Sequence, residues 1–235
     1  MLHAIAASLV LAAPLRVAVT GAGGQTGQLA FRKMLARPDD FSPLGIVRTE
    51  TSRSALVDSG IPADCVVVAD VTDAGAVATA MKGCDALIIG TSAKPAPTGA
   101  MDEATGRPLF SYPNGEPEVV DWLGQKAQID AAKACGDGTH VVICSSMGGT
   151  DPSNMLNALG RVTNDDGTTT GGNILLWKRK AEKYLSTSLH ADRSGHVSSQ
   201  HVSRPLTLTP RAQSSRARSR LWPAVHGRPP RRPHQ

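Results

Sequence analysis

The chain has 235 residues, of which 40% are hydrophobic, 19% are charged and only 3% are aromatic. This length suits one domain with appendages, and the shortage of aromatic residues leaves valine, isoleucine, leucine and alanine to build the core. The net charge of +5 is unevenly spread, because residues 187–235 carry +8 and residues 1–186 carry −3. We therefore expect no basic domain surface for specific nucleic-acid binding in the folded part.

The cysteines do not indicate a metal site, and the N-terminal segment does not indicate a membrane span. Cys65, Cys84, Cys135 and Cys144 form no CxxC pair, so we expect reduced thiols in an intracellular protein and no metal site. Residues 1–14, MLHAIAASLVLAAP, form an apolar extension that is too short to span a membrane. The extension is either a short apolar segment without a targeting role or a weak targeting segment. The expected locations are therefore the cytoplasm and the plastid.

Short apolar runs alternate with helical patterns between residues 15 and 186. The expected strands cover residues 16–20, 44–48, 65–71, 85–92 and 139–146. The expected helices cover residues 25–36, 52–60, 73–83, 119–136 and 173–185, with loops at 93–116 and 148–172. Nearly continuous apolar strands that alternate with helices are typical of a parallel sheet covered on both faces. We predict a doubly wound α/β domain of the Rossmann type over residues 15–186.

The alternating pattern stops after Ser186. Residues 187–235 contain nine arginines, eight serines and six prolines, and no apolar run longer than two residues. Such a composition cannot build a packed core. We expect a domain that is truncated after its fifth strand and following helix, and then a disordered basic tail. Whether that tail is genuine or the product of an out-of-frame 3′ end stays open.

The stretch TGAGGQTG, residues 20–27, joins the first expected strand to the first expected helix. Gly21 allows a tight turn, Gly24 lets the backbone approach a pyrophosphate, and Gly27 lets helix and strand pack closely. The start of the helix, at Gln25 and Thr26, adds free N–H groups and the positive end of a helix dipole. The context predicts dinucleotide binding through these five residues, and a purely structural glycine turn is the alternative.

The end of the second strand bears on the choice between NAD and NADP. NAD sites usually place an acid about 20 residues after the glycines, on the ribose hydroxyls. Arg48 stands at this position instead, and its guanidinium suits the 2′-phosphate of NADP. We therefore favour NADP, with NAD still possible, because Glu50 would take the acidic role if the loop shifted. The alternative interpretation of Arg48 is an ordinary solvated charge at the end of the strand.

Three more residues at strand ends are candidate cofactor contacts. Asp70 and Val71 end the third expected strand, and a side chain there can reach the adenine. Asp70 or Thr72 would equally serve as the cap of the next helix. Thr91 ends the fourth expected strand, where the ribose and nicotinamide would pass, because ligands of open α/β sheets lie outside the carboxyl ends of the strands.

Several segments carry a resemblance to a known family. They include VTGAGGQTGQ, VDWLGQKAQIDAAK, VVICSSMGGTDP and GNILLWKRKAEKYL. Over about residues 15–186 the chain resembles atypical short-chain dehydrogenase/reductases of the NAD(P)H-binding, NmrA-like group, and especially plant and algal NAD(P)-binding Rossmann proteins. The resemblance implies an NADP-type cofactor held through Gly21, Gly24, Gly27 and Arg48. It also implies a small-molecule substrate, whose identity stays unknown.

The resemblance also implies catalytic positions. Ordinary members of the family use a serine, a tyrosine and a lysine, with the tyrosine as proton donor. Ser146, or its neighbour Ser145, matches the serine, and Lys180 matches the lysine, which would also bind the nicotinamide ribose. Leu176 stands four residues before Lys180, where the tyrosine would be.

Because the tyrosine is missing, two functional interpretations stay open. Tyr112 and Tyr184 are the two tyrosines of the chain, and neither begins a YxxxK motif. The chain is then either an NADP-dependent oxidoreductase that obtains its proton from Ser146, water or substrate, or a non-catalytic cofactor-binding redox sensor. Lys94 and Tyr112 are weaker candidates for substrate contacts, with ordinary loop residues as the alternative.

Overall fold

The computed structural model describes residues 13–103, 106–136 and 138–191. Most of the expected N-terminal extension and the expected tail beyond residue 191 lie outside the described residues. The strands are, in chain order, β1 (Leu15–Thr20), β2 (Phe41–Val47), β3 (Val66–Val68), β4 (Ala86–Ile89), β5 (Ala96–Met101), β6 (Pro108–Ser111), β7 (His140–Ile143), β8 (Val162–Thr163) and β9 (Thr169–Thr170). The helices are α1 (Gln25–Leu35), α2 (Glu50–Asp58), α3 (Ala74–Ala80), α4 (Gln125–Cys135) and α5 (Ile174–Ala191), with short turns η1 (Ala63–Cys65), η2 (Glu118–Gly124) and η3 (Met155–Ala158).

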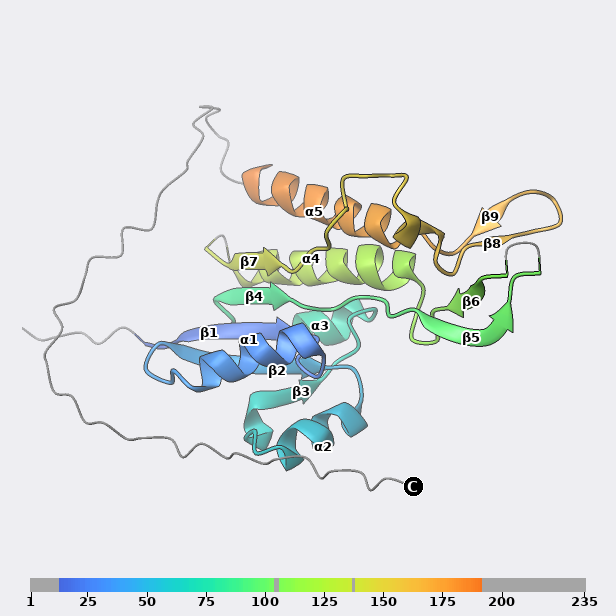
Figure 1. Cartoon of the computed structure of the whole chain (residues 1–235). Helices are drawn as coiled ribbons and strands as arrows, with labels where there is room; N and C mark the ends of the chain where they lie inside the picture. Colours follow the sequence, from blue (N-terminus) through green and yellow to red (C-terminus); the bar gives the residue numbers. More distant parts are fainter. Residues whose placement is uncertain (1–12, 104–105, 137, 192–235) are drawn as a thin grey trace, which may run out of the picture. The chain divides into compact units, whose positions relative to one another are not determined.

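A parallel sheet of five strands forms the centre of the domain (Figure 1). Its strand order is β3-β2-β1-β4-β7. The chain therefore moves outward from β1 to β3, returns to the other side of β1, and continues outward through β4 to β7. This reversal between β1 and β4 is where ligands bind in doubly wound sheets. The predicted doubly wound Rossmann fold is confirmed.

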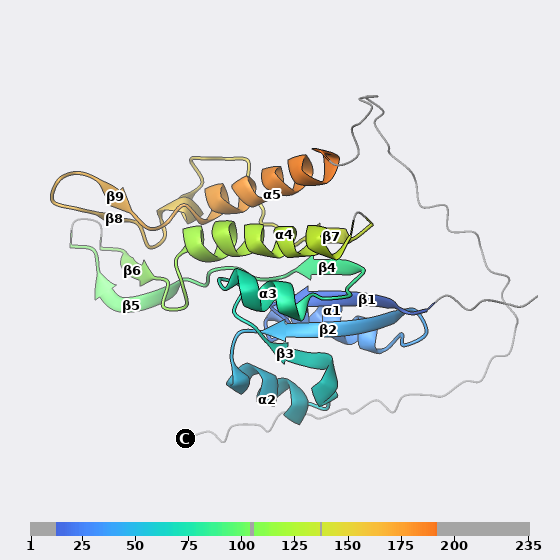
Figure 2. The ribbon, with the colours of Figure 1, turned by 180° about the vertical axis from the view of Figure 1, so that it is seen from behind.

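Apolar side chains pack on both faces of this sheet. Val17 and Val19 of β1 belong to one cluster with residues of α1 and α2, whereas Ala18 belongs to a second cluster with residues of α3 and α4. The alternation follows from the two-residue period of a strand. The two opposite views agree, since α1 lies in front of β1 in Figure 1 and α3 lies in front of it in Figure 2.

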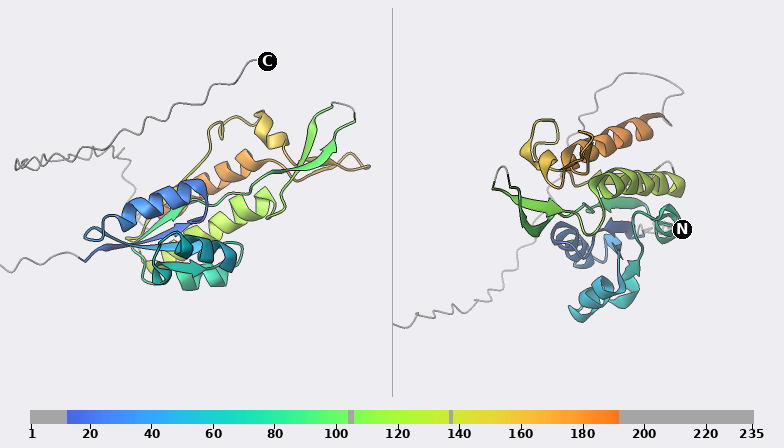
Figure 3. Two further views of the ribbon diagram at one scale, coloured as in Figure 1. Left: turned by 60° about the horizontal axis from the view of Figure 1, so that its bottom comes forward. Right: turned by 90° about the vertical axis from the view of Figure 1, so that its right-hand side faces the viewer.

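Two antiparallel hairpins stand in the segments that the sequence analysis assigned to loops. β5 pairs with β6, and β8 pairs with β9. Both hairpins project beyond the carboxyl ends of the parallel strands, as the left view of Figure 3 shows. The expectation of plain loops was wrong there. The hydroxyl of Tyr112, just after β6, donates a hydrogen bond to the carbonyl of Leu159 and so connects the two segments.

Two helices differ from their predicted extents. The helix expected at 119–136 begins with η2, which is π-helical, and only then continues as α4. α5 runs to Ala191, so the first five residues of the expected tail are helical. None of the helices in the described ranges is both long and apolar enough to cross a membrane.

The sheet ends at β7 within the described residues, where no further strand pairs with its outer edge. β7 also has one open face, because the side chain of Val142 is 57% exposed. Val141 and Ile143, on the other face, pack against the cluster that includes α3 and α4.

Candidate cofactor site

The glycine loop between β1 and α1 has the geometry that its sequence predicts. Gly21 has a φ of +68°, which favours glycine, and a Cβ there would lie 2.7 Å from the carbonyl oxygen of Gly90. A Cβ on Gly27 would collide with the carbonyl oxygen of Gly21. The turn and the close packing of α1 on β1 both therefore require glycine.

The N-terminus of α1 is open toward solvent. Among the described residues, no side chain caps this helix, and its first turn contains no acid. Gly24, Gln25 and Thr26 are exposed. The first N–H groups of a helix have no partner within the helix, so those of Gln25, Thr26 and Gly27 are placed to bind an anion.

A cavity of about 380 Å³ lies at the carboxyl ends of the central strands. Its described lining includes six of the predicted cofactor residues: Gly21, Gly24, Arg48, Asp70, Val71 and Thr91. Gln25, Thr26 and Gly27 stand beside this lining in the first turn of α1. An exposed glycine backbone and an uncapped helix start, together with Arg48, fit a phosphate-bearing nucleotide.

Arg48 is positioned at the rim of the cavity by the loop after β6. Its two terminal nitrogens donate hydrogen bonds to Asn114, to the main-chain oxygen at 2.7 Å and to Oδ1 at 2.6 Å. Glu50, which would take the acidic role of an NAD site, pairs with Arg53 at 2.9 Å and is absent from the described lining. The basic residue, rather than the acid, therefore faces the cavity.

Asp70 organises the turn after β3. Its Oδ1 accepts hydrogen bonds from the main-chain N–H of Thr72 at 2.9 Å and from the Thr72 hydroxyl at 2.8 Å. The N-cap of α3 is Asp73, which accepts from the N–H of Ala76. The alternative in which Asp70 or Thr72 caps this helix was wrong, and Asp70 is held in the cavity wall instead.

Two buried glutamines, which the sequence analysis did not single out, support Thr91. Gln125 donates to the main-chain oxygen of Thr91, and Gln128 donates to its hydroxyl, both at 3.2 Å. Both side chains are fully buried. Glutamines three apart that share a helix face with Ile129 and Ala132 are the signal that could have identified them, because buried amides need partners.

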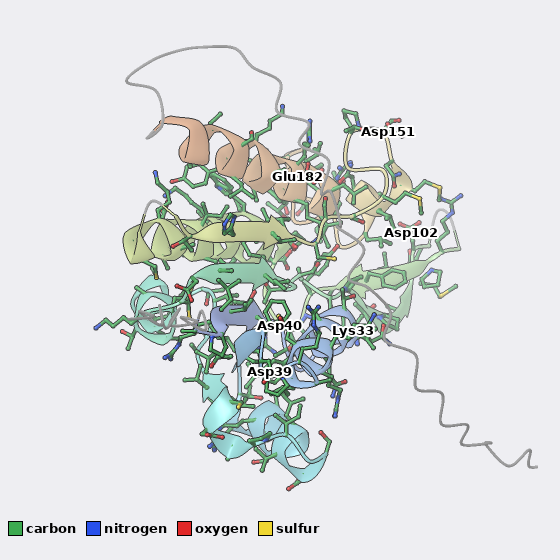
Figure 4. The ribbon with its side chains drawn as sticks, turned by 90° about the vertical axis from the view of Figure 1, so that its left-hand side faces the viewer. Lys33, Asp39, Asp40, Asp102, Asp151 and Glu182 are labelled. Atoms are coloured by element: carbon green, nitrogen blue, oxygen red, sulfur yellow. The ribbon has the colours of Figure 1, made fainter. Side chains whose placement is uncertain are left out.

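The serine predicted for catalysis stands apart from the cavity. Ser146 is half-buried after β7 and is not in the described lining. Its neighbour Ser145 donates a hydrogen bond to Glu182 of α5, a side chain that is labelled beside α5 in Figure 4. Partial burial raises the pKa of Glu182, but hydrogen bonds from Ser145 and Arg179 outweigh it and lower that pKa. Ser145 therefore links β7 to α5.

The structure does not bring Lys180 to the cavity. Its ammonium lies 4.4 Å from the ring centroid of Trp122 and 4.9 Å from that of Trp177. Lys178 is the buried lysine of α5, and its Nζ lies 2.7 Å from Oδ1 of Asp121. The buried residues Ile174, Lys178 and Ala181 follow helical spacing, which is the signal that would have selected Lys178.

The partner of Lys178 lies directly behind the cavity wall. Asp121 is fully buried, and its second oxygen accepts a hydrogen bond from the N–H of Ala93 at 2.9 Å. Ser92 and Lys94, on either side of Ala93, line the cavity. Burial raises the pKa of Asp121, and the Lys178 ammonium opposes that shift. This ion pair thus connects α5 to the wall of the cavity.

Neither tyrosine hydroxyl is placed to serve the cavity. Tyr112 is buried with its hydroxyl on Leu159, and burial raises its pKa to about 12. The hydroxyl of Tyr184 donates to Asp130 on α4. Neither tyrosine is in the described lining, whereas Lys94 is. No group of three metal-ligating side chains occurs in the part of the chain that the structure describes.

The NAD(P)H-binding family matches residues 21–192, a range that contains the glycine loop and the whole cavity. The chain belongs to this family, and its resemblance to atypical short-chain dehydrogenase/reductases is confirmed. It is 44% identical over 177 residues to the chloroplastic protein At2g37660 of Arabidopsis thaliana. It is 42% identical over 193 residues to the sanguinarine reductase of Eschscholzia californica.

The similarity covers only part of these relatives. Each alignment covers 74% of this chain, but it covers 50% of the Arabidopsis protein and 65% of the sanguinarine reductase. Pen from Bacillus thuringiensis is a similar solved structure, with a TM-score of 0.51 and 16% identity over 77% of this chain and 46% of that one. At that identity the likeness shows the fold alone. The chain is therefore an NAD(P)H-binding Rossmann protein that spans half to about two thirds of its curated relatives.

Proposed function

We propose that this chain is an NADP(H)-dependent oxidoreductase of the atypical group, without the usual catalytic tyrosine. The observation that carries the cofactor choice is Arg48, which faces the cavity while Glu50 is held by Arg53. A guanidinium can bind a 2′-phosphate, whereas an acid in its place would repel it. The 42% identity to a sanguinarine reductase supports reduction as the reaction class.

The proposed cofactor contacts follow the lining of the cavity. The loop glycines Gly21 and Gly24, with the N–H groups of Gln25, Thr26 and Gly27, bind the pyrophosphate. The remaining contacts come from strand ends. Asp70 and Val71 border the adenine, Arg48 binds the 2′-phosphate, and Thr91 borders the sugar on the nicotinamide side, held there by the two buried glutamines.

The bound cofactor would supply the hydride, so this chain must orient the substrate and, where the acceptor atom needs a proton, leave it a proton source. Ser146 is the proposed substrate contact, and its hydroxyl or water supplies the proton. The ribose contact predicted for Lys180 requires its ammonium to leave the two indole rings. Lys178, already behind the cavity wall, is the better placed of the two lysines to support the nicotinamide end.

The cofactor proposal is tested by calorimetric titration of NADPH and NADH into the wild-type chain and Arg48→Ala. We expect NADPH to bind at least about tenfold more tightly than NADH, because a charge-assisted bidentate contact contributes that much or more. The preference should disappear in Arg48→Ala while NADH binding persists. An NADH preference in the wild-type chain would contradict the assignment of Arg48.

A non-catalytic redox sensor is the second candidate. The placement of both tyrosines away from the cavity favours it, because no phenol is available as proton donor. NADPH oxidation against quinones, aldehydes, enones and sanguinarine separates the two functions. Turnover would establish the enzyme, and tight NADPH binding without any turnover would establish the sensor.

We also propose a location in the plastid or the cytoplasm. The name of the Arabidopsis relative as chloroplastic supports the plastid. A fluorescent protein fused to the C-terminus, expressed in leaf cells, distinguishes the two by its overlap with chlorophyll. Secretion of the fusion would contradict both.

A further inference from the structure

We infer that Asn114 is a positioning residue that presents the Arg48 guanidinium to the 2′-phosphate and so sets the discrimination between NADPH and NADH. The inference rests on the proposed function, since it gives Arg48 the phosphate contact. Asn114 comes from the loop after β6, 66 residues away from Arg48 in sequence. Both residues line the same cavity.

Asn114 holds Arg48 at two points. The main-chain oxygen of Asn114 accepts from Nη1 of Arg48 at 2.7 Å, and its Oδ1 accepts from Nη2 at 2.6 Å. A long, exposed arginine side chain otherwise samples many rotamers, and binding a phosphate would have to order it. With two of its nitrogens held, the guanidinium is already ordered at the rim before the phosphate arrives.

The guanidinium keeps free donors for a phosphate. Arginine has five N–H donors and no acceptor. The two bonds to Asn114 engage two of them, and three remain for phosphate oxygens. Asn114 therefore does not compete with the phosphate, because it takes one part of the guanidinium and leaves the rest available.

Asn114 itself is held by a turn with a buried anchor. The N–H of Gly115 donates to the carbonyl oxygen of Tyr112 at 3.1 Å, which closes the turn Tyr112–Gly115 around Asn114. Gly115 has a φ of +112°, which favours glycine. Tyr112 is only 5% exposed, and its hydroxyl is bound to Leu159. The acceptor atoms of Asn114 thus have a fixed support.

The local charges also favour a phosphate at this rim. Glu50 is paired with Arg53, and Asp70 is the one carboxylate in the described lining, against the cation of Arg48. Lys94 adds a second cation to the cavity lining. The Asn114 side chain is neutral, so it orders Arg48 without cancelling its charge.

The test is a double-mutant cycle on binding, with the dissociation constants of NADPH and NADH measured by calorimetry for the full chain. The variants are Asn114→Ala, Arg48→Ala and the double variant. Asn164→Ala is the matched control, because Asn164 is exposed and its side chain bonds to Thr168 in the β8–β9 turn. The Ala variant keeps the main-chain acceptor and removes the carboxamide, and with it the Oδ1 acceptor.

We expect Asn114→Ala to weaken NADPH binding by about three- to tenfold, because binding must then order the arginine side chain itself. NADH binding should stay within about twofold, as should both constants in the control. In the Arg48→Ala background the Asn114 change should have no further effect, because the two residues act as one unit.

Other outcomes overturn the inference in distinguishable ways. If Arg48→Ala removes the NADPH preference but Asn114→Ala does not reduce it, the proposed function stands and the role of Asn114 is wrong. Tighter NADPH binding by Asn114→Ala would show that Asn114 competes with the phosphate. A wild-type chain that binds both cofactors equally, or neither, would contradict the proposed function together with this inference.

Discussion

At β1 the sheet is covered on both faces, whereas at β7 one face is open. Val19 of β1 is completely buried, and Val142 of β7 is 57% exposed. The described lining of the cavity comes mainly from the ends of β1 to β4 and includes no residue of β7. The described residues therefore line the proposed adenosine end of the site, whereas Ser146 lies outside this lining.

This difference between β1 and β7 separates cofactor binding from catalysis in this chain. The proposed phosphate contacts sit on strand ends and a glycine loop that a packed core supports on both faces. The candidate catalytic residues follow the last paired strand or lie on α5. A chain that binds NADPH through the first half need not turn over substrate in the second.

The Lys178–Asp121 ion pair connects α5 to the segment around Ala93 in the cavity wall. Its loss should have the largest effect on the free energy of unfolding. Lys178→Ala leaves the carboxylate of Asp121 buried without its cation. Removing one partner of a buried pair costs about 3–5 kcal/mol of unfolding free energy. Urea unfolding followed by circular dichroism measures the change.

Lys180→Ala is the matched control for that experiment. It removes an exposed ammonium over two indole rings, and we expect a loss of about 1 kcal/mol or less. Equal losses in the two variants would contradict the assignment of Lys178 as the buried lysine. A large drop in NADPH affinity for Lys180→Ala alone would instead restore the ribose contact predicted from the sequence.

Tyr112 anchors the segment that brings Asn114 to the cavity, and its titration should weaken the fold at alkaline pH. Burial raises its pKa from about 10 to about 12. Its contribution is complete below pH 10 and is lost as the pH rises toward 12, because the unfolded chain releases the proton first. The loss is on the order of 2–3 kcal/mol in all.

The measurement compares the unfolding free energies of the wild-type chain and Tyr112→Phe between pH 8 and pH 11. The difference between them should be constant up to about pH 10 and should then change in favour of the phenylalanine variant. A difference that does not vary with pH would show that the Tyr112 hydroxyl is not buried in solution.

Gly27→Ala tests the enclosed half directly. The added methyl would collide with the Gly21 carbonyl, so α1 must move away from β1. Overpacking of this kind costs about 1–3 kcal/mol, and the displaced helix start should weaken NADPH binding as well. Gly83→Ala is the control, since a Cβ there meets nothing within 4 Å and its positive φ adds only local strain. Unchanged NADPH binding by Gly27→Ala would contradict the close approach.

The fold was predictable where the chain repeats a simple pattern. Apolar runs such as that of β1 and the glycines after it predict the parallel, doubly wound sheet and the place of the cavity. The hairpins β5–β6 and β8–β9 were missed because their strands are short, rich in proline, glycine or threonine, and largely exposed. A π-helical start such as η2 depends on tertiary contacts and has no sequence signature.

The site was predictable where backbone geometry decides it and not where side chains choose partners. Gly21 and Gly27 were identified because only glycine fits there. The choice of Lys180 over Lys178 followed from a motif position, whereas the burial of Ile174 and Ala181 on the same helix face selects Lys178. The bond from Arg48 to Asn114 joins residues that are 66 positions apart, and no local sequence pattern predicts it.

The smallest expected effect concerns the open face itself. Val142→Ala should cost about 0.5 kcal/mol or less, because more than half of the side chain is already in water. Val19→Ala, the same change on a fully buried strand, should cost about 1.5–3 kcal/mol. Urea unfolding of both variants measures the difference between the two halves of the sheet.

A loss above about 1.5 kcal/mol for Val142→Ala would overturn the comparison, since a side chain in water cannot contribute that much. Some further surface would then cover β7 in solution, either from chain outside the described residues or from a second copy. Repeating the measurement over a hundredfold range of protein concentration separates these two, because only association depends on concentration. A small and concentration-independent loss would leave β7 as the open side of the domain.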